Sequence, residues 1–378
     1  MNNLKKRRGE NIMTKGFLVL ETGETFPGDW IGYECEVSGE VVFNTSMTGY
    51  QEMLTDPSYA GQILTLSYPI IGNYGVSSDS HESNDLHVAG VILSDICETP
   101  SHFQSEITLS ESLKQAAVPG LKNVDTRTLV TIIRKQQTVR GKLILEKIVP
   151  GYGHKFSLPN SHKLIEQVSV KKSIVLGAGS SCHVVLVDFG YKKSIVDALI
   201  KQDCKVTIVP HSSSFEDIEK LNPYGVIISN GPGDPEDLER YFPLIKRLTR
   251  RYPTLGICLG HQLIALAYGG KTKKMSFGHR GANHPIKDLF TGKVTITSQN
   301  HGYVVIKESL NPKYFQLLFQ NVNDGSVEGL KHVSLPVITV QFHPEAHPGP
   351  SDAHYIFTDF VETARMTRGK QLCATVHP

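Results

Sequence analysis

The spacing of hydrophobic and polar residues divides the chain into two halves. In the first half, short runs rich in Val, Ile, Leu and Phe are separated by Gly, Pro and Asp, a pattern typical of β-strands and turns. Helical spacing of apolar residues is confined to two short segments. We therefore expect a β-rich first half with strands at 16–21, 40–44 and 62–67 and helices at 109–115 and 125–134.

In the second half, continuous apolar runs alternate with amphipathic segments. The alternation favours a doubly wound parallel sheet with helices on both faces. The overall fold class predicted is α/β, with a β-rich amino-terminal domain followed by a doubly wound α/β domain. Ser213 and Glu216 have the spacing of a helix capping box. The expected strands are 184–187, 205–210, 225–229, 253–257 and 337–342, and the expected helices are 191–201, 213–221, 235–250, 259–268 and 352–368.

Changes in these patterns set the expected domain boundaries. Periodicity is lost in a Gly-, Ser-, Pro- and Lys-rich stretch near the middle, which we interpret as a linker. The expected parts are an extension (1–15), an amino-terminal domain (16–150), the linker (151–181), the α/β domain (182–370) and a tail (371–378). Because Arg7–Glu10 could be encoded by a purine-rich ribosome-binding stretch, a second hypothesis starts translation at Met13.

Charge and cysteine content exclude several classes of protein. The 39 Lys and Arg residues nearly balance 37 Asp and Glu residues, so neither nucleic acid nor an anionic membrane is an expected partner. No apolar run reaches the roughly 18 residues of a membrane-spanning helix. Six scattered cysteines indicate reduced thiols and a cytoplasmic protein. Val175–His183 has two glycines of a dinucleotide fingerprint but precedes a strand, so nucleotide binding is not expected there.

The sharpest chemical signal is Gly256-Ile257-Cys258-Leu259-Gly260, at the junction of a predicted strand and helix. A tight turn at such a junction exposes its central side chain above the sheet, and glycines on either side relieve backbone clashes. The amino end of the following helix favours negative charge. An arbitrary cysteine is usually a core residue, but this setting predicts that Cys258 is a nucleophile.

A nucleophilic thiol needs a base, and the base needs an orienting group. His343 and Glu345 follow the predicted strand 337–342, at the carboxyl edge where open α/β sheets bind ligands. We therefore expect a triad of Cys258, His343 and Glu345. The rival bases His261, His301 and His347 lack this combination of a strand end and a neighbouring carboxylate.

A third element is the turn Ser229-Asn230-Gly231-Pro232-Gly233-Asp234-Pro235. Its glycines let backbone amides approach a ligand closely, as an oxyanion hole requires. It lacks the GxxxxGK[ST] pattern of a phosphate loop. By itself the segment could equally be a plain turn.

Together these elements resemble a known family. The half from about Val184 to about Met366 resembles class I, triad-type glutamine amidotransferase domains. The remaining motifs make the chain similar to the carbamoyl-phosphate synthase small subunit family over nearly its whole length after Met13. These motifs are Asn44–Tyr59, Tyr68–Gly75, Val124–Arg127, Phe277–Pro285 and Ser298–Tyr303.

The resemblance implies roles for particular residues. Cys258 would attack the side-chain amide of glutamine to form a γ-glutamyl thioester, with His343 moving protons and Glu345 orienting it. The Leu259 N–H and the Gly231–Gly233 turn would form the oxyanion hole. The positions that match the family's glutamine-binding residues are Ser46, Gly231, Gly233, Leu259, Gln262, Asn300, Gly302 and Tyr303.

The resemblance also implies partners. A large subunit would bind ATP and Mg²⁺, accept ammonia and make carbamoyl phosphate from bicarbonate for arginine or pyrimidine synthesis. No cofactor or metal is expected on this chain, and a higher oligomer of the heterodimer stays open. The alternatives are a glutaminase subunit for another synthase, such as the anthranilate or GMP enzyme, and a non-catalytic regulatory subunit.

Overall fold

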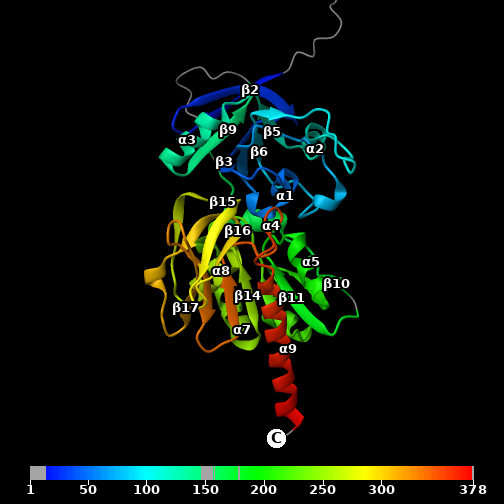
Figure 1. The fold of residues 1–378 in the computed structure, drawn as a ribbon, viewed down its shortest axis with the longest axis vertical. Coiled ribbons are helices and arrows are strands. Elements are labelled where there is room, and N and C mark those ends of the chain that lie inside the picture. The colour runs from blue at the N-terminus through cyan, green and yellow to red at the C-terminus, as the bar shows by residue number, and fades with distance from the viewer. Residues whose placement is uncertain (1–13, 146–155, 157, 178, 377–378) are drawn as a thin grey trace, which may run out of the picture.

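The computed structural model describes residues 14–145, 156, 158–177 and 179–376. It has two domains, arranged one above the other in Figure 1, with the carboxyl-terminal helix extending away from both. The predicted extension lies almost wholly outside the described residues. Among the described residues, no helix is long and apolar enough to cross a membrane.

The first domain is built on a closed barrel with strand order β1-β2-β8-β6-β4-β3-β9. Closure of the barrel pairs the backbone of strands that would otherwise be sheet edges, and alternate apolar residues fill the interior. The predicted strands near 16, 40 and 62 are confirmed as β1, β3 and β4. The barrel strands are β1 (Lys15–Leu20), β2 (Thr25–Gly32), β3 (Val37–Asn44), β4 (Gln62–Leu66), β6 (Gly90–Ile92), β8 (Pro119–Lys122) and β9 (Val139–Ile144).

Short helices and a small sheet complete this domain. The helix α3 (Thr126–Gln136) begins as predicted, because the Asp125 side chain accepts a hydrogen bond from the N–H of Thr128. The helix α2 (Leu109–Gln115) has a capping box formed by Thr108 and Glu111. The other elements are α1 (Tyr50–Thr55), η1 (Pro57–Tyr59), η2 (Ser78–Ser80), β5 (Ile70–Ile71) and β7 (Asp95–Ile96).

The second domain contains a ten-stranded sheet with order β10-β12-β11-β13-β14-β19-β18-β17-β15-β16. The central strands from β12 to β19 are parallel, as predicted, and antiparallel strands extend both edges. The strands are β10 (Ile174–Leu176), β11 (Cys182–Asp188), β12 (Cys204–Pro210), β13 (Gly225–Ile228), β14 (Thr254–Ile257), β15 (Thr272–Asp288), β16 (Val294–Val305), β17 (Phe315–Asn321), β18 (Val327–His332) and β19 (Val337–Val340).

Helices cover both faces of this sheet, which confirms the doubly wound arrangement. One apolar core includes Ile245 of α7 and Leu263 of α8; the other includes Leu199 of α5 and Phe357 of α9. Burying these two faces is the main favourable contribution to folding. The helices of the domain are α4 (Ser161–Val168), α5 (Lys193–Lys201), α6 (Phe215–Lys220), η3 (Pro235–Tyr241), α7 (Phe242–Arg251), α8 (Leu259–Ala267), η4 (Lys307–Ser309) and α9 (Tyr355–Val376).

Two predicted helices differ in detail from the structure. The capping box predicted for Ser213 is wrong: Ser214 caps α6, and its side chain accepts a hydrogen bond from the N–H of Asp217. The single helix predicted for 235–250 is divided into η3 and α7, and within η3 itself Leu238 leaves helical geometry with φ −100° and ψ 21°. The hydrophobic spacing after Pro235 does not distinguish a 3₁₀ helix from the first turns of an α-helix.

The stretch predicted to lack regular structure also differs. Within 151–181 the structure contains α4 and β10, and Asn160 caps α4 by accepting a hydrogen bond from the N–H of Lys163. Only three residues of α4, Ser161, Leu164 and Ile165, are buried, so its apolar stripe is too short to stand out in the sequence. At the other end, α9 continues through most of the predicted tail.

Candidate active site

Cys258 lies at the predicted strand-to-helix turn, between β14 and α8. Its backbone has φ 52° and ψ −104°, outside the regions that non-glycine residues ordinarily occupy. Such strain persists only where the surrounding structure enforces it, and it concentrates at functional sites. The side chain is 3% exposed, yet it lines an open cavity, and its thiol donates a hydrogen bond to the carbonyl oxygen of Asn300 at 3.6 Å.

The two glycines that flank this turn have a steric role. A Cβ on Gly260 would lie 2.1 Å from the carbonyl oxygen of Ile228, and one on Gly256 would lie 2.8 Å from that of Gly260. The N–H of Gly260 donates to the carbonyl of Ser229, which ties the start of α8 to the end of β13. The turn is therefore held by close backbone packing that side chains would prevent.

His343 and Glu345 follow β19, as the sequence predicts, and they interact directly. The Nδ1–H of His343 donates to Oε1 of Glu345 at 2.6 Å. This bond leaves Nε2 of His343 as the free nitrogen, and it has no hydrogen-bond partner among the described residues. Burial alone would lower the pKa of His343, but Glu345 and the neighbouring Cys258 thiol raise it to about 10. Cys258 and His343 thus lie near enough for their charges to interact, as a nucleophile and its base require.

A buried lysine completes the charge balance of the triad. The Nζ atom of Lys192 lies 3.2 Å from Oε1 of Glu345 and donates to the carbonyl oxygens of Ala346 and His347. Burial would raise the pKa of Glu345, but Lys192 and His343 lower it to about 2. The carboxylate therefore stays ionised and can stabilise an imidazolium on His343.

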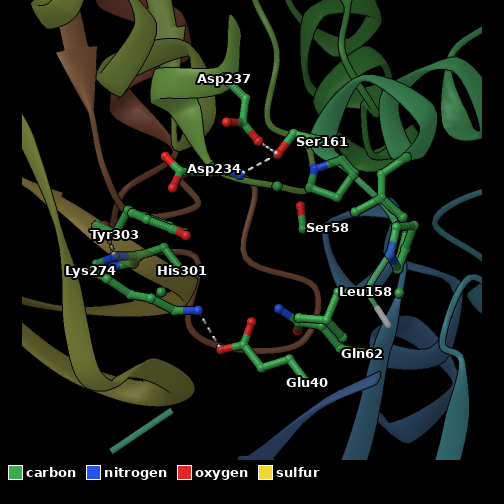
Figure 2. Close-up of a pocket in the computed structure, with 18 of the residues that line it drawn as sticks. Glu40, Ser58, Gln62, Leu158, Ser161, Asp234, Asp237, Lys274, His301 and Tyr303 are labelled. Carbon is green, nitrogen blue, oxygen red and sulfur yellow. Dashed lines mark hydrogen bonds and ion pairs between the residues drawn. The ribbon is translucent and has the colours of Figure 1, made fainter. Parts of the chain in front are cut away.

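The cavity in front of Cys258 has a volume of about 280 Å³ and lies between the two domains. Figure 2 shows its walls, with Glu40, Ser58 and Gln62 contributed by the first domain and Asp234, His301 and Tyr303 by the second. Two contacts drawn there frame the cavity. Lys274 Nζ lies 3.5 Å from Glu40 Oε1, and Ser161 Oγ donates to Asp237 Oδ2 at 2.6 Å.

Most residues assigned to glutamine binding by resemblance lie together. Besides Cys258, the cavity is lined by Gly231, Gly233, Gln262, Asn300, Gly302 and Tyr303. Leu259 is the first residue of α8, so its N–H has no acceptor within the helix. Pro232 has no N–H, so the amide donors of the neighbouring turn come from the glycines on either side of it.

Ser46 and Leu259 are not among the residues that line the cavity with Cys258. Ser46 lines a smaller cavity, of about 30 Å³, which shares Asn300 with the main cavity and also contacts His343. Ser58 of η1 lines the main cavity instead and accepts a hydrogen bond from Asn230 Nδ2 at 3.0 Å. The Ser46 hydroxyl is buried and has no hydrogen-bond partner among the described residues, so its role in glutamine binding stays a prediction.

Side-chain amides fix the cavity wall near the nucleophile. Gln262 Nε2 donates to the carbonyl of Tyr303 and to Oε1 of Gln341, both at 2.9 Å. Asn300 Nδ2 donates to Oδ2 of Asp56 at 2.9 Å, which links the two domains across the cavity. The pocket therefore depends on both domains for its shape.

A buried cluster of histidines supports β16, the strand that carries Asn300 and Tyr303. His279 interacts with Asp324 through Nε2 at 3.0 Å and with Glu328 through Nδ1 at 3.4 Å. Burial would lower the pKa of His279, but these carboxylates raise it to about 9. Gln299 lies within hydrogen-bond distance of both His279 and His301. His301 in turn contacts the carbonyl of Tyr303 through Nδ1 at 2.8 Å.

Among the described residues, the group whose spacing would suit a metal ion belongs to this histidine cluster. Ligand atoms of His279, His301 and Glu328 lie within 4.8 Å of one another. Both ring nitrogens of His279 already face hydrogen-bond partners, and its raised pKa indicates a protonated ring, which cannot ligate a metal. The arrangement therefore fits a hydrogen-bonded support for β16 better than a metal centre.

The rival histidines have other partners. His261 is fully buried and contacts Thr339 Oγ1 at 2.7 Å, and burial lowers its pKa to about 3. His301, a residue of β16, lines the cavity, but its ring nitrogens face the carbonyl of Tyr303 and Gln299. His347 lies 4.0 Å from Glu82. Sequence reasoning missed Lys192 and Ser58. Neither stands in a local motif with the triad, although Ser58 falls inside the Asn44–Tyr59 segment.

Comparisons with known proteins show the family to which the chain belongs. A family model described as "Glutamine amidotransferase class-I" matches residues 185–363, and one described as "Carbamoyl-phosphate synthase small chain, CPSase domain" matches residues 18–143. The arginine-specific small chain of carbamoyl phosphate synthase from Halalkalibacterium halodurans is 47% identical over 348 residues, covering 92% of this chain and 96% of the relative. The Bacillus subtilis arginine-specific chain has 47% identity with the same coverage. The small chain from Listeria monocytogenes serotype 4b is 48% identical over 361 residues, 95% of this chain and 98% of its own.

Proposed function

Because this chain belongs to the carbamoyl phosphate synthase small chain family, we propose that it is the subunit that hydrolyses glutamine through Cys258, His343 and Glu345. The observation that carries the proposal is the position of Cys258. It stands on a strained turn at the helix amino end, beside an imidazole already bonded to a carboxylate. Nucleophile, base and orienting group thus occur in the order that covalent amide hydrolysis needs.

In the first half-reaction, the Cys258 sulfur attacks the side-chain carbonyl carbon of glutamine after His343 takes the thiol proton. The tetrahedral oxyanion accepts hydrogen bonds from the N–H of Leu259 and from the Gly231–Gly233 turn. Losing one such donor typically costs about 2.7–4 kcal/mol of transition-state stabilisation. When the C–N bond breaks, His343 returns its proton to the departing ammonia, which leaves a γ-glutamyl thioester on Cys258.

In the second half-reaction, His343 takes a proton from water, and the resulting hydroxide attacks the thioester carbonyl. The C–S bond breaks, the thiol regains the proton and glutamate leaves. Glu345 keeps the Nδ1 proton of His343 in place during both steps, so that Nε2 remains the working nitrogen. Lys192 keeps Glu345 ionised while the imidazolium forms.

The ammonia would pass to a large chain, the partner implied by the names of the relatives. We propose that ATP and Mg²⁺ bind to that partner and that carbamoyl phosphate is made there from bicarbonate. Two of the three relatives compared are named arginine-specific and one is not, so both arginine and pyrimidine synthesis fit as destinations.

The test is ammonia release from glutamine by the purified chain, alone and with its large chain. Cys258→Ser should remove the activity, whereas Cys35→Ser, a half-buried cysteine of the barrel domain, should keep it. Carbamoyl phosphate synthesis from added ammonia should survive in the Cys258→Ser complex. Equal activity of wild type and Cys258→Ser with glutamine would overturn the proposal, and loss of both syntheses would assign Cys258 a structural role.

A further inference from the structure

A carboxylate of the barrel domain caps a helix of the second domain. Glu82 follows η2 and is 3% exposed. Its carbonyl oxygen accepts a hydrogen bond from the N–H of Lys193 at 2.7 Å. Its Oε2 accepts hydrogen bonds from the N–H and the hydroxyl of Ser194 at 3.1 and 2.6 Å. Glu82 therefore satisfies two N–H groups at the start of α5 that have no acceptor within the helix.

The helix α5 has no cap of its own. Lys192 occupies its N-cap position, and the lysine side chain makes no capping hydrogen bond. A lysine side chain has no acceptor with which to make one. A carboxylate at this end of a helix is also favoured by the helix dipole. The start of α5 thus depends on a residue that precedes Ser194 by 112 positions in the chain.

Glu82 is itself held in place by the barrel domain. Its N–H donates to Oγ1 of Thr55, the last residue of α1, at 2.9 Å. The Thr55 hydroxyl donates in turn to the carbonyl of Gln51 at 2.9 Å, within the same helix. The residue that caps α5 is therefore anchored to α1, so the position of α5 is tied to that of the first domain.

The capped end of α5 carries the lysine that faces the triad. Lys192 directly precedes the two capped N–H groups, and its Nζ lies 3.2 Å from Oε1 of Glu345. Burial would lower the pKa of Lys192, but nearby carboxylates, those of Glu345 and Glu82 foremost, raise it. Oε1 of Glu82 also lies 4.0 Å from Nδ1 of His347, in the loop after Glu345. Glu82 thus lies against both segments that Lys192 joins.

From these contacts we propose that Glu82 is a positioning residue for the triad, because it fixes the start of α5 and so keeps Lys192 against Glu345. The barrel domain thereby sets the rate of the chemistry at Cys258 from behind the triad. The inference rests on the proposed function, since the reaction of the triad is what reports it. Glu82 acts on that reaction through Lys192 and not through the substrate.

The experiment measures glutamine hydrolysis by the complex with the large chain. Glu82→Ala should lower kcat about 5- to 30-fold, the factor by which loss of a helix cap shifts an equilibrium away from the capped arrangement. The KM should stay within about twofold of wild type, because Glu82 does not line the cavity with Cys258. Glu82→Gln keeps an oxygen that can accept both hydrogen bonds from Ser194, so its kcat should stay within about threefold of wild type.

Glu106→Ala is the matched control. Glu106 accepts the same two kinds of hydrogen bond, from the N–H and the hydroxyl of Ser78, but it does so at an exposed site within the barrel domain. This variant should leave kcat and KM unchanged. An unchanged kcat in Glu82→Ala, or a loss in Glu82→Gln as large as that in Glu82→Ala, would overturn the inference.

A double-mutant cycle tests whether Glu82 acts through Lys192. In a Lys192→Met background, Glu82→Ala should lower kcat by less than about twofold, because the side chain that it positions is already gone. Losses that multiply in the double variant would contradict the inference and would assign Glu82 a purely structural role. A wild-type complex that releases no ammonia from glutamine would instead contradict the proposed function.

Ser194→Ala tests the same contact if Glu82→Ala does not fold. It removes the hydroxyl that donates to Glu82 and leaves the carboxylate and the backbone N–H in place. The kcat should fall about two- to tenfold, as expected for the loss of one hydrogen bond, and the loss should disappear in the Lys192→Met background. Ser78→Ala, which removes the matching hydroxyl beside Glu106, should have no effect. A kcat in Ser194→Ala equal to that of wild type, or a loss that persists without Lys192, would overturn the inference.

Discussion

Lys192 and Glu345 form a buried ion pair behind the triad, with Nζ 3.2 Å from Oε1 and side chains that are 4% and 1% exposed. Lys192 also binds two carbonyls of the loop after Glu345. The lysine therefore sets both the charge of the carboxylate and the position of the segment that carries it. Removing one partner of such a pair leaves an uncompensated buried charge.

Lys192→Met should lower kcat for glutamine hydrolysis about 10- to 100-fold, because Glu345 loses the charge that keeps it ionised. The acidic limb of the pH–rate profile should move to higher pH as the pKa of Glu345 rises. Lys193→Met provides the control, since the neighbouring lysine is exposed and pairs with Asp197. A lower rate with an unshifted profile would indicate a purely structural role for Lys192.

Substitution of the two candidate serines distinguishes the cavities. Ser58→Ala should raise the KM for glutamine several-fold, because Ser58 lines the cavity with Cys258 and accepts a hydrogen bond from Asn230. Ser46→Ala should also raise the KM, because the Ser46 hydroxyl is buried without a hydrogen-bond partner, among the described residues, in the smaller cavity that reaches Asn300 and His343. Steady-state kinetics of both variants decide the point. An unchanged KM in Ser46→Ala would place Ser46 outside the glutamine pocket.

Gly260→Ala should destabilise the second domain by about 3 kcal/mol or more, because overpacking against backbone leaves no side chain to move away. The added Cβ would lie 2.1 Å from the carbonyl of Ile228. Chemical denaturation measures the effect, with Gly369→Ala as control, where a Cβ meets nothing within 4 Å. Unchanged stability in Gly260→Ala would mean that the turn at Cys258 is not held by this contact.

The His279 cluster predicts a particular pH dependence of stability. The pKa of His279 is raised from 6.5 to about 9 in the folded protein. Its contribution is therefore complete below pH 6.5 and is lost as the pH rises through about 9. The difference in unfolding free energy between wild type and His279→Gln should shrink between those values, whereas His102→Gln, at an exposed site, should show none. A constant difference across this range would exclude a protonated His279.

Local patterns were sufficient to predict the second domain and to single out the residues of the candidate triad. Strands such as β11 and β13 are continuous apolar runs, and Gly256–Gly260 combines a strand end, a thiol and a helix start within five residues. His343 and Glu345 follow β19 by three and five residues, so parallel packing brings them to the same edge as Cys258. Each of these inferences depends on neighbours along the chain.

The features that could not be predicted depend on contacts between distant segments. Ser161 of α4 enters the cavity wall, although nothing in its surrounding sequence distinguishes it from a linker serine. Lys192 is one of many lysines until folding places it 3.2 Å from Glu345. The difference between Ser46 and Ser58 likewise arises only when the barrel domain packs against the second domain. Burial and pairing between segments 76 or more residues apart leave no periodic trace in the sequence.

The account depends on the acylation of the Cys258 thiol. Acid quenching during turnover tests this acylation most directly. With radiolabelled glutamine, wild-type complex quenched in the steady state should carry label on the peptide that contains Cys258. Cys258→Ser should carry none and should hydrolyse glutamine at least about a thousandfold more slowly. Label on a different residue, or undiminished glutamine hydrolysis by Cys258→Ser, would contradict the account.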